Sequence, residues 1–82
     1  MEHDEIVTSP CHGIIKKIKV KEKDKIMEWE PLFIIQTHYG ENKVITVGIR
    51  GSVQSIEVQE GDEVIPGMVL SYVKDDSYIE SY

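Results

Sequence analysis

The side chains in this sequence that are best suited to bond-making chemistry are the thiol of Cys11 and the imidazoles of His3, His12 and His38. Such groups hold zinc when several of them converge on one ion, but a single cysteine beside a histidine matches no zinc-ligand spacing. A cysteine nucleophile needs a nearby base and an orienting group, and adjacency along the chain does not supply that geometry. The sequence therefore predicts no metal site, no catalytic residue and no enzymatic activity.

The other candidate site is a polar segment between two runs that are rich in Ile, Val, Phe and Thr. Such runs form pleated strands, and the glycine between them permits a chain reversal, so the pattern is typical of a β-hairpin. The predicted tip presents six side chains or backbone positions to solvent: His38, Tyr39, Gly40, Glu41, Asn42 and Lys43.

Composition limits what this tip can serve. The 82 residues are enough for one domain, predicted to span residues 1–82. The formal net charge of −6 argues against nucleic-acid binding, which requires a basic surface. No apolar run approaches the roughly 20 residues that cross a bilayer, and residues 1–5 are acidic where a signal peptide would be basic. We expect a cytoplasmic protein that binds neither nucleic acid nor a membrane.

The elements that must position the tip all have the pattern of strands. In the second half of residues 14–21, lysines alternate with Ile18 and Val20, which predicts a strand with one face exposed to solvent. A short strand over residues 5–8 is expected to end before Pro10, because proline has no backbone donor for a sheet ladder. No segment combines helical periodicity with capping residues, so the predicted fold class is all-β.

The chain also contains an internal repeat. A shift of 38 residues places Gly13 on Gly51 and reproduces the pattern G-x-[IV]-x-x-I-x-V-x-E-x-D-x-[IV]-x-x-x-x-x-L without gaps. Two equivalent units indicate a pseudo-twofold arrangement in which each half buries its apolar face against the other. The predicted core consists of Ile15, Ile18, Val20, Leu32, Ile34, Val53, Ile56, Val58, Leu70 and Tyr72.

The second copy, GSVQSIEVQEGDEVIPGMVL at residues 51–70, resembles the signature G-x-[IV]-x-x-[IL]-x-V-x-x-G-D-x-V-x-x-G-x-x-L of biotinyl/lipoyl-attachment (carrier) domains. The first copy resembles the opening half of the same family, so the resemblance covers about residues 6–73. It implies a flattened β-barrel (a barrel-sandwich hybrid) of two four-stranded sheets. It also implies that the hairpin between the halves is where the family presents a lysine that carries biotin or lipoate.

The family's lysine position falls on Tyr39, and a phenol cannot replace an amine in forming an amide with biotin or lipoate. Lys43 is the only nearby alternative. If the turn centres on Gly40 and Glu41, His38 pairs with Lys43 and this lysine lies on the returning strand. We therefore expect a cofactor-free accessory domain whose tip binds another protein. The alternative is a carrier modified with biotin or lipoate at Lys43 that serves a biotin-dependent carboxylase or a 2-oxo acid dehydrogenase-type complex.

Two turn positions differ between the copies. Lys23 and Trp29 stand where the second copy has Gly61 and Gly67. Glycines in such turns often have positive φ, so either the first-half turns have another geometry or their backbone is strained. Trp29 is expected to be a packing aromatic or, alternatively, an anchor for a partner.

Charge is also distributed unevenly. Residues 16–25 contain six of the nine Lys and Arg residues, whereas residues 54–63 contain none and carry four acidic residues. The basic segment is expected to protect a sheet edge or to dock an acidic surface, including that of a second copy. Residues 74–82 are polar and acidic, which predicts a mobile tail or a short docking segment.

Overall fold

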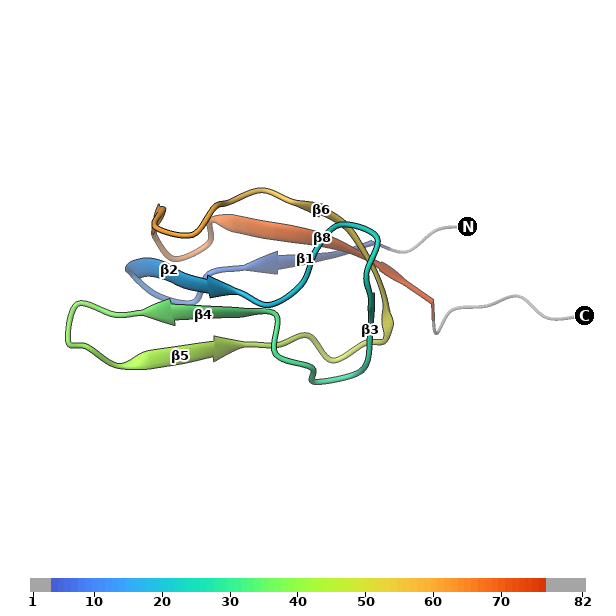
Figure 1. The fold of residues 1–82 in the computed structure, drawn as a ribbon, viewed down its shortest axis with the longest axis horizontal. Coiled ribbons are helices and arrows are strands. Elements are labelled where there is room, and N and C mark those ends of the chain that lie inside the picture. The colour runs from blue at the N-terminus through green and yellow to red at the C-terminus, as the bar shows by residue number, and fades with distance from the viewer. Residues whose placement is uncertain (1–3, 77–82) are drawn as a thin grey trace, which may run out of the picture.

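The computed structural model describes residues 4–76, which form eight β-strands and no helix. The strands form two four-stranded antiparallel sheets, in the orders β1-β8-β6-β3 and β5-β4-β2-β7 (Figure 1). The predicted all-β flattened barrel of two sheets is therefore confirmed. The strands are β1 (Asp4–Thr8), β2 (Gly13–Ile18), β3 (Lys25–Ile26), β4 (Phe33–Gln36), β5 (Asn42–Ile45), β6 (Gly51–Ile56), β7 (Glu63–Val64) and β8 (Val69–Asp75). Within residues 4–76 there is no helix long and apolar enough to cross a membrane.

The pseudo-twofold relation extends to the strand order and the core. A shift of 38 residues maps β1–β4 onto β5–β8, and it maps the order of one sheet onto the order of the other. Among the described residues, every buried hydrophobic side chain except Phe33 has a buried hydrophobic partner 38 residues away, and the residue equivalent to Phe33 is the buried Ser71. These pairs are Val7 with Ile45, Ile15 with Val53, Val20 with Val58, Ile26 with Val64, Leu32 with Leu70, and Ile35 with Val73.

The predicted core is wrong at Ile34 and Tyr72, which are only half-buried, and Ile35 and Val73 take their places. The reason lies just before β4. Leu32 and Phe33 are both fully buried, so the inward and outward alternation restarts between these neighbours. Ile18 and Ile56 are also partly exposed, but they pack against the core.

Gly13 and Gly51 are equivalent in the repeat, and each lies too close to the neighbouring strand of its sheet for a larger residue. A Cβ atom added at Gly13 would lie 2.5 Å from the carbonyl oxygen of Gln36, and one added at Gly51 would overlap the carbonyl of Lys74.

β2 and β6 each contain a β-bulge, between Ile15 and Lys17 in one half and at the equivalent position in the other.

The turns with Lys23 and Trp29 keep the geometry of their glycine counterparts. The φ angles of Lys23 and Gly61 are 75° and 95°, and both residues donate equivalent backbone hydrogen bonds, to Val53 O at 2.7 Å and to Ile15 O at 2.8 Å. Of the two expectations, the strained backbone is therefore correct. Lys23 and Trp29 are the non-glycine residues with positive φ among residues 4–76.

The folded region extends slightly beyond the predicted range of 6–73. β1 begins at Asp4 and β8 continues through Asp75, where Lys74 pairs with Asp4. The predicted tail of residues 74–82 therefore starts too early, and its remainder, residues 77–82, lies outside the described residues. Lys16 and Lys17 of the basic segment lie on β2, which pairs with β4 on one side and with β7 on the other side only at Gly13 and Ile14. The role of the basic segment at a sheet edge therefore stays a prediction.

Candidate functional site

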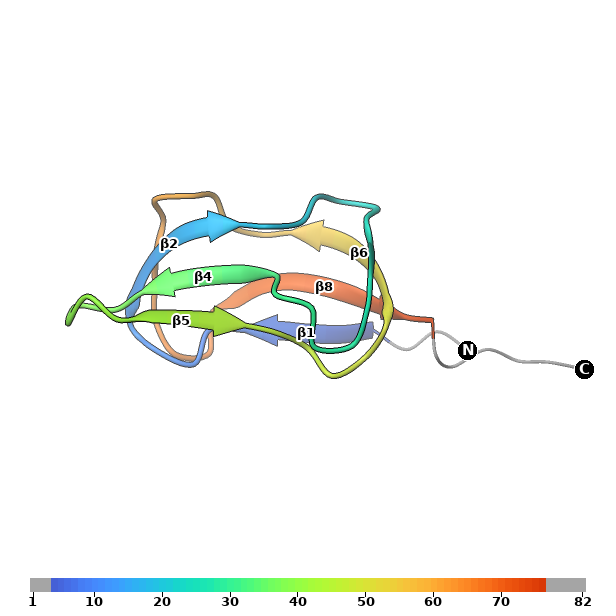
Figure 2. The same cartoon turned by 60° about the horizontal axis from the view of Figure 1, so that its bottom comes forward.

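The candidate site is the tip of the β4–β5 hairpin, which projects beyond the rest of the barrel (Figure 2). In the ladder, Gln36 pairs with Asn42 and Ile35 pairs with Lys43. The predicted pairing of His38 with Lys43 is therefore wrong. Lys43 lies within β5, as predicted, but it lies further from the chain reversal than that pairing implied.

The chain reverses over His38, Tyr39 and Gly40. The amide of Gly40 donates to the carbonyl of Thr37 at 3.0 Å, and the amide of Thr37 donates to the carbonyl of Glu41 at 2.8 Å. Gly40 has a φ of 82°. These are the features of a three-residue hairpin loop in which a tight turn is followed by a left-handed residue. The glycine therefore ends the turn, and Tyr39 lies at the middle of the loop.

Thr37 holds this loop with its side chain, and sequence reasoning did not identify it. Its hydroxyl oxygen accepts hydrogen bonds from the amides of Glu41 at 3.2 Å and Tyr39 at 3.3 Å. Threonine commonly fixes turns in this way, so its position before a polar, glycine-containing segment was the available signal. The tip is consequently a preorganised turn.

The side chains of the tip are turned to solvent. Tyr39 is 91% exposed, and His38, Glu41, Asn42 and Lys43 are exposed as well. Tyrosine combines an apolar ring with a polar hydroxyl, and for that reason it is favoured where a surface is covered by a partner. Tyr39 contributes little to the packing of the free domain because almost none of it is buried.

A groove of about 440 Å³ lies beside the tip, and residues from the β1–β2 and β7–β8 connections complete it. The pairing of β2 with both β4 and β7 brings these connections to the hairpin. The rings of His12 and His38 have centroids 6.2 Å apart and are tilted by 34°. The lining residues are Cys11, His12, Thr37, His38, Tyr39, Glu41, Lys43 and Pro66.

Cys11 and His12 were considered in the sequence only as a reactive pair, and their place beside the tip was missed. Nothing in the local sequence shows this proximity, since it depends on the order of strands in the sheet. Among residues 4–76, no three His, Cys, Asp or Glu side chains are grouped so that they could hold a metal ion. The arrangement can bind a partner's side chain in the groove, and the amine that it offers is that of Lys43.

No protein-family model matches the chain. A biotin carboxyl carrier protein of acetyl-CoA carboxylase from Solanum lycopersicum is 29% identical over 69 residues, which are 84% of this chain and 97% of that sequence.

Two solved structures have the same fold. The urea carboxylase of Kluyveromyces lactis superimposes with a TM-score of 0.80 at 20% identity, over 89% of this chain and 6% of that one. A single-chain, multi-domain long-chain acyl-CoA carboxylase superimposes with a TM-score of 0.81 at 12% identity, over 88% and 7%. This chain thus spans a small part of each. The predicted resemblance to biotinyl/lipoyl-attachment domains is confirmed by the carrier protein in sequence and by the two carboxylases in fold.

Proposed function

We propose that this chain is a cofactor-free biotinyl-like domain, without catalytic activity, that binds another protein through its hairpin tip (His38, Tyr39, Gly40, Glu41, Asn42 and Lys43). The observation that carries the proposal is the place of Tyr39. It lies at the middle of the loop, 91% exposed, where the resemblance to carrier domains would put the attachment lysine.

The residues present do not fit a covalently attached biotin or lipoate. Attachment as an amide requires a primary amine, and Tyr39 offers a phenol. The amine of Lys43 belongs to a residue within the β4–β5 ladder, opposite the buried Ile35. An enzyme that recognises a lysine presented at a tight turn would have to accept one displaced along a strand.

The tip is better suited to recognition of a protein. The Thr37 hydroxyl and two backbone hydrogen bonds fix the loop before any partner arrives, so little conformational freedom remains to be lost on binding. Tyr39 then supplies a large amphipathic surface, and the adjacent groove lined by His12, His38 and Lys43 can receive a side chain of the partner. Tyrosine is among the residues that carry most binding energy at interfaces.

The second candidate is a carrier that is modified at Lys43 and serves a carboxylase or a 2-oxo acid dehydrogenase-type complex. The 29% identity to a biotin carboxyl carrier protein favours it. The two candidates differ in one measurable property, the mass of the chain isolated from cells that contain active biotin and lipoate ligases.

Site-specific photo-crosslinking tests the binding role. A photoreactive phenylalanine analogue replaces Tyr39 in one variant and the exposed Gln59, which lies outside the tip and its groove, in a matched control. After irradiation in the native cells, position 39 is expected to give a discrete product of higher mass that position 59 does not give. Identical patterns from the two positions, or no product from position 39, would contradict a tip that binds a partner.

A further inference from the structure

The backbone of Trp29 matches that of a glycine. Its φ is 63°, against 88° for Gly67, the equivalent residue of the second half. Their amides donate equivalent hydrogen bonds, from Trp29 to Val47 O at 2.9 Å and from Gly67 to Ser9 O at 2.8 Å. The fold therefore requires a left-handed residue at this point, and the second half meets the requirement with glycine. A bulky side chain in the left-handed region is a genuine outlier.

Burial does not explain this strained residue, because 68% of Trp29 is exposed. The ring lies against Gly48, where an added Cβ would be 2.7 Å from the ring carbon Cη2. The 38-residue shift aligns Trp29 with Gly67 and Pro10 with Gly48. Where Trp29 lies against Gly48, the equivalent positions therefore hold Gly67 and Pro10, so the larger residue is on the opposite segment. The indole thus packs against the backbone at Gly48, but most of its surface faces solvent. Backbone strain of this kind commonly marks a functional residue.

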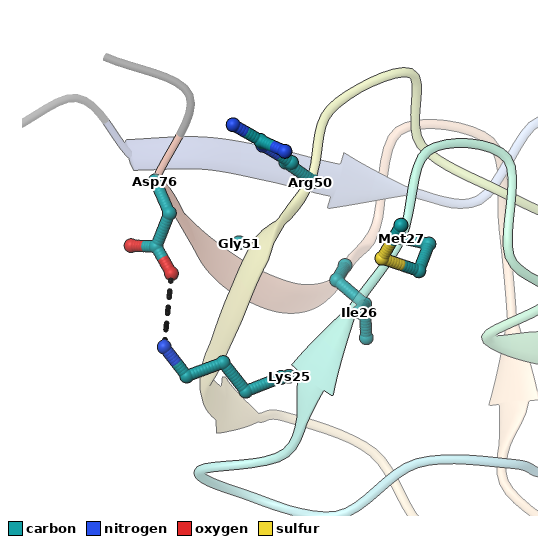
Figure 3. A pocket seen from close by; sticks show the side chains of 6 residues that line it. All are labelled: Lys25, Ile26, Met27, Arg50, Gly51 and Asp76. Carbon is teal, nitrogen blue, oxygen red and sulfur yellow. Dashed lines mark ion pairs between the residues drawn. The ribbon is translucent and has the colours of Figure 1, made fainter. Parts of the chain in front are cut away.

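The two segments that meet at Trp29 carry exposed apolar and cationic side chains: Met27 precedes Trp29, and Arg50 follows Gly48, which the indole contacts. Met27 is 65% exposed, and β3 and the residues after it run alongside the connection between β5 and β6, as shown by the pairing of Ile26 with Gly51 and the Trp29 hydrogen bond to Val47. This brings Met27 and Arg50 to the same hollow. Figure 3 shows their side chains around Gly51 together with those of Lys25, Ile26 and Asp76. The hollow has a volume of about 370 Å³, within the range of pockets that accept ligand groups.

The charges around this hollow leave Arg50 available. Asp76 is engaged by Lys25, with their charged atoms 3.5 Å apart, and a carboxylate oxygen of Glu30 accepts a hydrogen bond from the amide of Met27 at 2.9 Å. Arg50 is exposed and forms no ion pair with any carboxylate among residues 4–76. Glu28, also exposed, lies between Met27 and Trp29 in sequence and limits how much acidic charge a partner can bring.

We propose that Met27, Trp29, Arg50 and the hollow, here called the Trp29 surface, bind a peptide segment of a partner protein in which a bulky apolar side chain lies next to a carboxylate. The apolar side chain covers Met27 and the indole, and the carboxylate pairs with Arg50 in a bidentate manner. Tryptophan and arginine are the residues most enriched at the energetic centres of interfaces. β3, whose residues line the hollow, lies at the end of the barrel away from the hairpin tip (Figure 1), so the Trp29 surface does not depend on the function proposed for the tip.

Intrinsic fluorescence tests the proposal directly, because Trp29 is the only tryptophan in the chain. The probe is the peptide acetyl-Ser-Glu-Leu-Phe-Asp-Ser-amide, which contains no tryptophan or tyrosine. Titration is expected to shift the emission to shorter wavelength and to saturate with a Kd below about 1 mM, the weak end of specific recognition. One control peptide has Gln and Asn in place of the acids, and another has Ser in place of Leu and Phe. Each is expected to bind at least tenfold more weakly.

Calorimetry with variants then assigns the binding to these residues. Trp29→Gly restores the residue that the second half uses at this backbone conformation, so it is expected to fold and to lose at least tenfold in affinity. Arg50→Gln is expected to lose affinity for the acidic peptide alone, and Met27→Ser provides a second apolar deletion. Lys23→Gly, which makes the same change at the other strained position, and Tyr39→Ala are expected to bind normally.

Three results would overturn the proposal: no saturable response of the wild type at millimolar peptide, equal binding of the neutral peptide, or unchanged affinity of both Trp29→Gly and Met27→Ser. Sedimentation of the free chain adds a fourth. A wild-type dimer that Arg50→Gln dissociates would make a second copy the occupant of this surface and contradict the peptide.

Discussion

Tyr39 and Lys43 lie four residues apart on one hairpin, but only Tyr39 is in the turn, and Lys43 pairs with the buried Ile35 inside the β4–β5 ladder. This relationship is the basis of our proposal that the domain is cofactor-free and not a carrier modified at Lys43. A carrier needs its amine where the chain reverses, and the chain reverses at a phenol. The proposed role therefore depends on a tip that is preorganised and exposed but offers no amine at its centre.

Thr37 is predicted to stabilise this tip through its hydroxyl. Thr37→Val keeps the shape of the side chain but leaves the amides of Glu41 and Tyr39 without their acceptor. We expect the free energy of unfolding to fall by about 1 kcal/mol, the net value of a hydrogen bond of this kind, and the exchange of the Glu41 amide to accelerate. Denaturant unfolding and hydrogen exchange measure the two effects.

Thr46→Val is the matched control for this change, because no hydrogen bond of the Thr46 side chain is found among the described residues. Equal losses of stability in the two valine variants would show that the Thr37 hydroxyl does not fix the loop.

The inward side of β4 is predicted to be the side of Ile35. Ile35→Ala removes a fully buried side chain and is expected to cost about 3 kcal/mol, whereas Ile34→Ala, at a half-buried neighbour, is expected to cost less than about 1.5 kcal/mol. Urea or thermal unfolding compares the two. A larger loss for Ile34→Ala would mean that the register of β4 against β2 and β5 is wrong.

Lys23 is predicted to destabilise the domain slightly through its backbone. With a φ of 75°, its left-handed conformation costs about 1–2 kcal/mol. A glycine removes this cost, but it loses more conformational entropy on folding, which offsets part of the gain. Lys23→Gly is expected to raise the free energy of unfolding by about 0.5–1 kcal/mol. Lys21→Gly, at an exposed lysine two residues earlier without positive φ, should instead lower it by a similar amount. If both glycines destabilise the domain, the left-handed strain at Lys23 is negligible.

Much of the architecture could be predicted from the sequence because the repeat constrains it twice. The 38-residue shift aligned Ile15 with Val53, Val20 with Val58 and Leu32 with Leu70, and all of these are buried. The local pattern failed where the alternation is interrupted. Nothing in the letters around Leu32 and Phe33 shows that two consecutive side chains face inward, and this exchanged Ile34 for Ile35 in the predicted core.

The site was predictable in position but not in detail. The hairpin and its exposed residues follow from composition and a glycine. The register, however, depends on whether Gly40 begins or ends the turn. The hydrogen bonds from the Gly40 amide to the carbonyl of Thr37 and from the Thr37 amide to the carbonyl of Glu41 place Gly40 at the end. The neighbours of the tip could not be predicted at all. Cys11, His12 and Pro66 approach it because β2 lies between β4 and β7, an order that no local pattern specifies.

The most direct test of the central claim is the intact mass of the protein isolated from cells that contain active biotin and lipoate ligases, with a known carrier domain fully modified in the same cells as the control. We expect the unmodified mass of the 82-residue chain. A mass increased by one biotinyl or lipoyl group, and restored to the unmodified value by Lys43→Arg, would contradict it and establish a carrier whose lysine lies on β5.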